Sequence, residues 1–340
     1  MYPIIFEFQP AEFAKIVREH GSFVLTTHLN PDGDALGSEL GLAEWLLSIG
    51  KSVRVINHSP NPEQYHFLDA ERSIIEVYDP AKHDEVFAKT EVLMLLDTND
   101  PDRAKSTGPF LLQHPMTVLV DHHLEPKDFA KHRFIDTEAT STGEMVFRLI
   151  SECSKMLGGT ISQKAAQALY VAIMTDTGSF RFPRTDSEIL RIAAELIDLG
   201  ADPVKTYNET YNTAKPSRIK LFAQCISSLK MSLDDRLATL LVTLDDLKAA
   251  GAIDEEVDGF VQFPLQVGTI EFSIFFLERK DGWKLSFRSR GSRSAAAVAK
   301  EFGGNGHFNA AGARMISDLS YEELRKKVVE AVERELAKPV

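Results

Sequence analysis

The sequence predicts an α/β protein with a parallel-sheet domain, a helical connector and a smaller α/β domain. The chain has 340 residues, about twice the length of a typical domain, so two hydrophobic cores are expected. In the first half, short apolar runs alternate with stretches of helical periodicity, which is typical of βαβ units. Beyond residue 230 the order of predicted strands and helices changes, which indicates the second domain.

Four short apolar segments of the first half predict buried strands, at 24–27, 53–56, 92–96 and 118–120. A helix is predicted over 35–49, because Leu36, Leu40 and Ala43 recur at helical spacing and Gly50 is a typical stop. Two further helices are predicted at 141–156 and 163–174. Because strands and helices alternate, these strands should pair in parallel.

The connector is predicted from two polar helical stretches, 187–199 and 204–229, that are interrupted at Pro203 and Pro216. The second domain has predicted strands at 237–243, 269–277 and 283–287 and helices at 245–250, 294–302 and 321–337. We therefore divide the chain into a first domain (1–190), a helical connector (191–230) and a second domain (231–340).

The composition argues against several classes of protein. A net charge of −12 disfavours binding to long duplex nucleic acid, because such proteins usually carry a basic surface for the phosphates. No apolar run approaches the roughly 18 residues of a membrane span, and residues 1–19 lack the features of a signal peptide. Cys153 and Cys225 belong to no C-x-x-C motif and should be buried free thiols. We expect a cytoplasmic protein without a membrane partner.

Residues of the types that bind metal ions follow three of the four predicted strands, and one more lies at the end of a predicted helix. They are His28, Asp32 and Asp34 after the first strand, Asp97 after the third, Asp121, His122 and His123 after the fourth, and Asp176 at the end of the helix. Because the carboxyl ends of parallel strands form one crevice, these residues should meet in space. Each alone is more often a helix cap or a turn residue, but four such groups facing one crevice favour a metal site.

This set of residues suits the hydrolysis of phosphate esters. Two divalent cations roughly 3.5–4 Å apart produce hydroxide near neutral pH and neutralise the charge of a phosphoryl group. Several carboxylates with a few imidazoles suit Mn²⁺, with Mg²⁺, Co²⁺ and Fe²⁺ as alternatives. The sequence therefore predicts a phosphoesterase with two divalent cations, for which Mn²⁺ is favoured.

Segments of this chain resemble the four motifs of the DHH phosphoesterase superfamily: His28-x3-Asp32-x-Asp34, Asp97, Asp121-His122-His123 and Asp176-Thr177. The glycine-rich segment 303–312 resembles the signature of its DHHA1 substrate domain, with Asn305 where the family usually has another glycine. The resemblance covers nearly the whole chain. It is strongest to the bifunctional oligoribonucleases with 3′-phosphoadenosine-5′-phosphate (pAp) phosphatase activity, the nanoRNase type.

The resemblance implies a role for each residue of the predicted metal site. One ion would be held by His28, Asp32 and Asp97, and the other by Asp34, Asp97, His122 and Asp176, so that Asp97 bridges the two. His123 would lie beside the reacting phosphate. Asp121 would orient the histidines without touching a metal.

A basic segment, 279–314, lies within this acidic chain, with eight Lys or Arg residues and two acidic ones. A solvated basic face is the usual explanation, but this segment surrounds the glycine-rich signature, where backbone N–H groups can approach phosphate oxygens. The predicted contacts to a second phosphate of the substrate are Arg288, Ser289, Gly304 and His307, and Arg103, which matches a recurrent arginine of the family, is a further candidate. Two segments are candidates for a base pocket, Tyr65-His66-Phe67-Leu68 and Phe180-Arg181-Phe182, although aromatic residues at such positions are more often core.

The leading prediction is a metal-dependent hydrolase of short oligoribonucleotides, dinucleotides and pAp. One alternative is a phosphodiesterase of cyclic or linear signalling dinucleotides. The other is an inactive nucleotide-binding module, which should have lost metal ligands, whereas all six are present. The glycine-rich second domain argues against an inorganic pyrophosphatase. A homodimer is left open by the sequence.

Overall fold

The structure is a computed structural model that describes residues 4–71 and 74–338. The chain divides into two units, Met1–Thr213 and Ala214–Val340. Helices α7 (Ser187–Asp198) and α8 (Pro203–Tyr211) belong to the first unit, and α9 (Pro216–Ser227) belongs to the second. Pro203 and Pro216 occupy the first turn of α8 and α9, where a missing N–H costs no helical hydrogen bond, so each proline starts a helix.

The described residues of the first unit form a seven-stranded sheet in the order β1-β7-β6-β5-β2-β3-β4. Its strands are β1 (Phe6–Glu7), β2 (Ser22–Thr26), β3 (Ser52–Asn57), β4 (Ile75–Val77), β5 (Val92–Leu96), β6 (Thr117–Asp121) and β7 (His132–Asp136). Neighbouring strands pair in parallel except β1, which is antiparallel to β7, so the predicted parallel sheet is confirmed. The order places β6, β5 and β2 side by side, and the three strands that precede the predicted metal ligands therefore end together.

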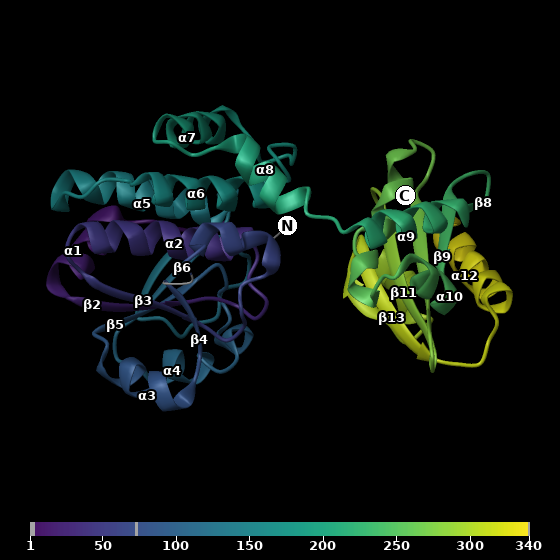
Figure 1. Cartoon of the computed structure of the whole chain (residues 1–340), viewed down its shortest axis with the longest axis horizontal. Helices are drawn as coiled ribbons and strands as arrows, with labels where there is room; N and C mark the ends of the chain where they lie inside the picture. Colours follow the sequence, from purple (N-terminus) through teal and green to yellow (C-terminus); the bar gives the residue numbers. More distant parts are fainter. Residues whose placement is uncertain (1–3, 72–73, 339–340) are drawn as a thin grey trace. The chain divides into compact units, whose positions relative to one another are not determined.

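Helices cover both faces of this sheet (Figure 1). One face carries α1 (Pro10–Glu19), α2 (Gly33–Ser48), α5 (Thr142–Leu157) and α6 (Gln163–Asp176), and the other carries α3 (Pro80–Lys89) and α4 (Gly108–Gln113). The first face buries Phe13, Trp45 and Phe134, and the second buries Phe87 and Leu111. Burial on both faces explains why the central strands are continuous apolar runs and do not alternate with polar residues.

Helix α2 lies unusually close to α6 because it has glycines where the two helices meet. A Cβ atom on Gly37 would collide with the carbonyl oxygen of Ala168. A Cβ atom on Gly33, at the start of α2, would collide with Thr175, at the end of α6. The N-terminus of α2 is therefore held beside the C-terminus of α6.

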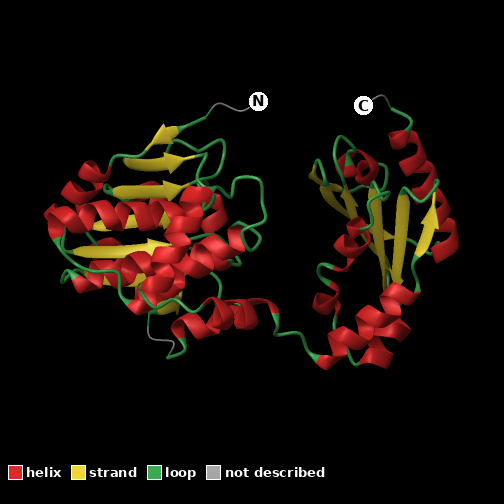
Figure 2. Cartoon of the chain, turned by 90° about the horizontal axis from the view of Figure 1, so that it is seen from above, coloured by secondary structure: helices red, strands yellow, loops and turns green. Residues whose placement is uncertain are grey.

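The described residues of the second unit form a six-stranded sheet in the order β12-β13-β11-β10-β9-β8. Its strands are β8 (Lys230–Ser232), β9 (Leu237–Val242), β10 (Phe272–Arg279), β11 (Gly282–Ser289), β12 (Asn305–His307) and β13 (Ala310–Ile316). Figure 2 shows both sheets in yellow with their helices in red. Helices α11 (Ala295–Lys300) and α12 (Tyr321–Leu336) pack on one core, and α9 and α10 (Leu244–Ala250) pack on another. The predicted smaller α/β domain is confirmed.

The helices and strands predicted from periodicity all occur, with ends shifted by a few residues at most. The prediction lacked α1, α3 and α4 and the six strands β1, β4, β7, β8, β12 and β13. Among the described residues, no helix combines the length and apolar character needed to cross a membrane.

Candidate metal centre

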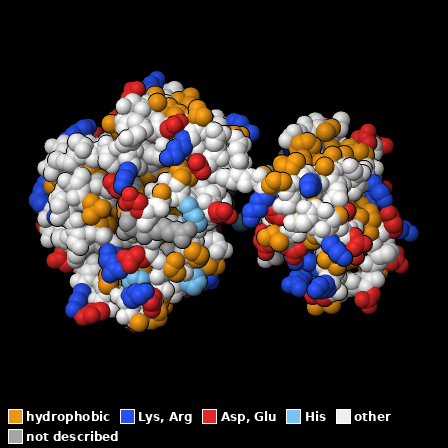
Figure 3. Space-filling view, in the orientation of Figure 1, with side chains coloured by type: hydrophobic (Ala, Val, Ile, Leu, Met, Phe, Trp, Pro, Cys, Tyr) orange, Lys and Arg blue, Asp and Glu red, His pale blue; other side chains and the backbone are white. Residues whose placement is uncertain are grey.

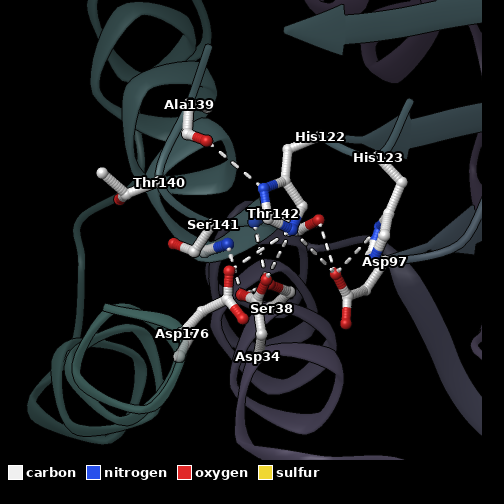
Figure 4. Close-up of polar contacts among 12 residues, drawn as sticks. Asp34, Ser38, Asp97, His122, His123, Ala139, Thr140, Ser141, Thr142 and Asp176 are labelled. Atoms are coloured by element: carbon white, nitrogen blue, oxygen red, sulfur yellow. Dashed lines mark hydrogen bonds and ion pairs between the residues drawn. The ribbon is translucent and has the colours of Figure 1, made fainter. Parts of the chain in front are cut away.

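Side chains from four separate elements point toward one another at the carboxyl end of the parallel sheet (Figure 4). Asp97 and His122 directly follow β5 and β6. Asp34 lies in the first turn of α2, and Asp176 is the last residue of α6. The close packing of α2 on α6 brings the last two carboxylates together, and the sheet brings the first two residues to the same place.

His28, Asp32 and Asp97 form one group, in which one ligand atom from each residue lies within 4.8 Å of the others. Nε2 of His28 is 3.5 Å from Oδ2 of Asp97, while its Nδ1 donates to a backbone carbonyl at 3.0 Å. Asp32 is the N-cap of α2, and its Oδ1 accepts from two backbone N–H groups. Capping uses one oxygen, so Asp32 retains the other for a metal.

His122 is at the middle of a second group, which contains Asp34 and Asp176. Its Nε2 is 3.6 Å from Oδ2 of Asp34, 3.5 Å from Oδ2 of Asp176 and 3.7 Å from Oδ1 of Asp97. Its Nδ1 donates to the carbonyl oxygen of Ala139 at 3.3 Å, which leaves Nε2 as the nitrogen that faces the carboxylates. Asp97 therefore faces both groups, one oxygen toward each.

The N-terminus of α5 holds two of these carboxylates. Oδ2 and Oδ1 of Asp34 accept the backbone N–H groups of Thr142 and Gly143, both at 2.8 Å. The hydroxyl of Thr142 donates to Oδ1 of Asp97 at 2.9 Å. Asp97 has a φ of 59°, in the left-handed region that is uncommon for residues other than glycine. Such a backbone conformation persists only where the surroundings impose it. The carboxylate of Asp97 is therefore positioned both by its own backbone and by the hydrogen bond from Thr142.

The acidic groups of the centre repel one another. Burial raises the pKa of Asp34 and of Asp97 well above the usual range, and neighbouring carboxylates raise both further. Burial also raises the pKa of Asp176 and lowers that of His122, which favours the neutral imidazole. Carboxylates and neutral imidazoles are ligands for divalent cations, whose charge would stabilise the ionised acids. The residues therefore fit divalent cations.

His123 is more open than His122, with a side chain 41% exposed. Its Nδ1 is 2.8 Å from Oδ1 of the fully buried Asp121, and 3.9 Å from Oδ1 of Asp97. Burial lowers the pKa of His123, but the hydrogen bond and charge of Asp121 outweigh it, so the pKa is raised overall. Arg103 is exposed in the segment Pro101–Ala104, and its charge opposes this rise. Both residues therefore lie at the open side of the centre.

The predicted substrate contacts of the second unit are divided between two places. Arg288 and Ser289 line a cavity of about 740 Å³ whose wall includes Phe222, Phe260 and Phe263. Gly304 directly precedes the edge strand β12, and the exposed His307 is the last residue of that strand. Lys and Arg side chains gather on part of this unit (Figure 3). The structure does not place Gly304 or His307 in the wall of the cavity.

The hydroxyl of Ser289 is already used within the second unit. It donates to the carbonyl oxygen of Arg293 at 2.6 Å and accepts from the N–H of Ala295 at 3.2 Å and from Nδ2 of Asn309 at 3.0 Å. A hydroxyl has one donor and two acceptor positions, so a contact to substrate would displace one of these bonds.

Sequence reasoning missed residues that support the centre through backbone groups. Thr142 and Gly143 donate to the carboxylates, and the carbonyl of Ala139 accepts from His122 and from Arg184, the latter at 3.3 Å. Only the N-cap Ser141, which accepts from the N–H of Glu144, gave a sequence signal, since serine before a helix is a common cap. That signal predicts a helix start but not what its N–H groups bind.

Family models match both units. The model of the DHH family, N-terminal domain, matches residues 22–173, and the model of the DHHA1 domain matches residues 242–338. The first range contains every predicted metal ligand except Asp176. The second contains Arg288 and His307.

Relatives and a solved structure match most of the chain. A Thermus thermophilus protein named bifunctional oligoribonuclease and PAP phosphatase NrnA is 33% identical over 96% of this chain and 94% of its own. The Bacillus subtilis protein of the same name is 27% identical over 90% of this chain and 93% of its own. The crystal structure of an exopolyphosphatase-related protein from Bacteroides fragilis, 31% identical, covers 96% of this chain and 95% of that chain with a TM-score of 0.83.

Proposed function

The chain belongs to the DHH family of phosphoesterases, and from this membership we propose that it hydrolyses short oligoribonucleotides, dinucleotides and pAp. It is a hydrolase that acts on phosphate esters and depends on metal ions. The observation that carries the proposal is the pair of ligand groups at the end of the parallel sheet, with Asp97 in one group and facing His122 of the other. In this assignment the first unit performs the chemistry and the second binds substrate.

We assign two divalent cations to the centre, with Mn²⁺ as the metal, because carboxylates and imidazoles make up the whole donor set. When bound, such ions supply hydroxide and neutralise phosphoryl oxygens. The residues of one site are His28, Asp32 and Asp97, and those of the other are Asp34, Asp97, His122 and Asp176. Asp97 is the shared ligand, and its contacts to α5 hold it in the orientation that reaches both sites.

His123 is assigned to the reacting phosphate. Asp121 holds its Nδ1, so the ring has a fixed orientation and its Nε2 is available to an oxygen of the phosphate. In the metal-free protein, burial lowers the pKa of His123, but the hydrogen bond and charge of Asp121 raise it overall. A protonated ring would donate a hydrogen bond to that oxygen. Asp121 acts through His123, because it is fully buried and cannot reach the substrate itself.

The substrate's second phosphate is assigned to the basic segment of the second unit. Arg288 supplies a guanidinium at the cavity, and His307 supplies an imidazole at β12. The N–H of Gly304 donates to the carbonyl oxygen of Ala299 at 2.9 Å, so Gly304 is assigned to the shape of this loop. Ser289 supports this region through its three hydrogen bonds. Arg103 adds a charge at the centre itself. A substrate with two phosphates, or a short oligonucleotide, has one phosphate for the metal centre and another for this basic segment. Long duplex nucleic acid is not expected to bind.

The compartment proposed for this activity is the cytoplasm. Cys153 and Cys225 are both free and buried. Burial raises the pKa of each thiol to about 12, so neither is a reactive thiolate. Such thiols are usual in a reducing compartment.

The test is hydrolysis by the full chain, loaded with Mn²⁺, of pAp, pApA, pGpG and cyclic dinucleotides at equal concentration. Release of phosphate from pAp and of mononucleotides from pApA is expected. Cleavage of cyclic dinucleotides alone would replace the proposal by a signalling phosphodiesterase. No turnover of any of them by protein with full metal content would make the chain a binding module.

A further inference from the structure

A second cavity, of about 330 Å³, opens beside the metal centre within the first unit. His122 and Asp176 form part of its wall, and the segment 182–185 forms another part. Ligand pockets are usually roughly 300–1,000 Å³, so this cavity suits one small group, such as a single nucleoside. Because two of the residues assigned to the metals line it, whatever enters it lies next to the reacting phosphate.

Phe182 gives the cavity an aromatic wall, although its side chain is 54% exposed. Its ring lies directly against the backbone of Gly178, where an added Cβ would collide with the ring and where φ is +57°. The N–H of Phe182 donates to the carbonyl of Thr177 at 3.0 Å. The ring therefore packs on the turn that follows α6, at Gly178, which is two residues after Asp176.

Thr185 and Arg184 lie on the same wall. The hydroxyl oxygen of Thr185 is buried beneath the surface and is not open to a ligand in the cavity. Arg184 also lines the cavity, and its guanidinium donates to the carbonyl of Ala139 that orients His122. A guanidinium has five N–H donors, so others remain for a ligand.

We propose that this cavity binds the nucleoside attached to the phosphate hydrolysed at the metal centre, with the base stacked on Phe182 and polar atoms of the nucleoside bonded to Arg184. A planar base matches an exposed ring, since stacking is sequence-tolerant and needs only a flat face. The polar edge of a nucleoside matches the guanidinium. This inference rests on the proposed function and specifies which part of the substrate the first unit holds.

A lone exposed phenylalanine needs no functional explanation, since folded proteins expose many apolar atoms. Phe182 differs from Phe6, which is 62% exposed on the edge strand β1, in that it lines a cavity together with assigned metal ligands and Arg184. Phe6→Ala is therefore the matched control.

The experiment compares pAp with its abasic analogue, the 3′,5′-bisphosphate of 1,2-dideoxyribose, in the Mn²⁺-loaded full chain. For Phe182→Ala, kcat/KM on pAp should fall by about five- to a hundredfold, the range of one lost base stack. The analogue should change by less than about twofold, because it has no base to stack. Phe182→Tyr should restore activity on pAp, and metal content should stay unchanged.

Equal losses on both substrates in Phe182→Ala would overturn the nucleoside site. If the wild type hydrolyses neither substrate, the proposed function fails instead. If it hydrolyses both with equal KM, the function stands and the nucleoside site is wrong.

Discussion

The hydroxyl of Thr142 donates a hydrogen bond of 2.9 Å to Oδ1 of Asp97. Thr142 is the first residue of α5, and its backbone N–H donates to Asp34, so one residue anchors a carboxylate in each ligand group. Asp97 turns its other oxygen toward His28. This contact therefore sets the direction in which the shared carboxylate faces.

Thr142→Val should weaken metal binding by about ten- to a hundredfold, the usual cost of losing a residue that orients a ligand. The backbone N–H that serves Asp34 stays in place, so the fold should be retained. Thr142→Ser keeps the hydroxyl and is the matched control. Titration of metal-free protein with Mn²⁺ by calorimetry measures the effect, and equal affinities in wild type and Thr142→Val would show that the hydrogen bond does not orient Asp97.

Asp97→Asn should reduce kcat on pAp by at least about a hundredfold, because an amide cannot act as a charged ligand shared by two ions. The fold should survive, since asparagine tolerates the left-handed backbone of this position. Without metal the variant should unfold at the same or a higher temperature than wild type, because it removes a carboxyl group whose ionisation is disfavoured by burial and by its acidic neighbours. Near wild-type turnover with two metals bound would refute the shared-ligand assignment.

That these residues meet in space could be predicted from the sequence because its signals are local. Strand ends followed by His or Asp are visible in the residues themselves, and the parallel order makes Asp97 and His122 neighbours. The approach of α2 to α6 was not predictable, because it depends on which residues of α6 meet Gly37. The role of Phe182 was not decided either, because its periodicity does not distinguish a core ring from a cavity wall. The missed strands β1, β4, β8 and β12 have two or three residues each, too few for a periodic signal.

Glu39 predicts a pH dependence of stability. It is fully buried, and burial raises its pKa to about 8, although a hydrogen bond from Asn57 opposes the rise. The folded protein therefore holds a proton on Glu39 that the unfolded chain releases above its ordinary pKa of 4.5. Stability from this group is present below pH 4.5 and is lost as the pH rises from there to about 8.

Glu39→Gln removes the ionisable carboxyl group but keeps the shape of the side chain and an acceptor for Asn57. The variant should gain stability relative to wild type as the pH rises, reaching a difference on the order of a few kcal/mol near pH 8. Urea unfolding of both proteins at pH 5, 6.5 and 8 measures this difference directly. A difference that does not change with pH would mean that Glu39 titrates normally in the folded protein.

Metal removal should abolish activity, and Mn²⁺ should restore it better than Ca²⁺. Ca²⁺ prefers six to eight oxygen ligands at 2.3–2.6 Å and would hold the two ions too far apart for one phosphoryl group. The measurement is phosphate release from pAp after dialysis against chelator, with bound metal quantified, followed by addition of each ion. Full activity in protein shown to be free of metal would exclude a metal-dependent reaction.

The last prediction separates substrate binding from the chemistry. Arg288→Ala and His307→Ala change the second unit, so metal content should not change. Each should weaken binding of pAp by roughly 1.5–3 kcal/mol, about ten- to a hundredfold, since each removes one charge-assisted contact to the remote phosphate. Bis(p-nitrophenyl) phosphate has only the reacting phosphodiester, so its hydrolysis should change much less. Lys284→Ala is the matched control, because Lys284 lies on the same strand and face as Arg288 but outside the cavity wall. Comparable losses of kcat/KM on both substrates would place the two residues at the metal centre, and the assignment of a separate phosphate site would then be wrong.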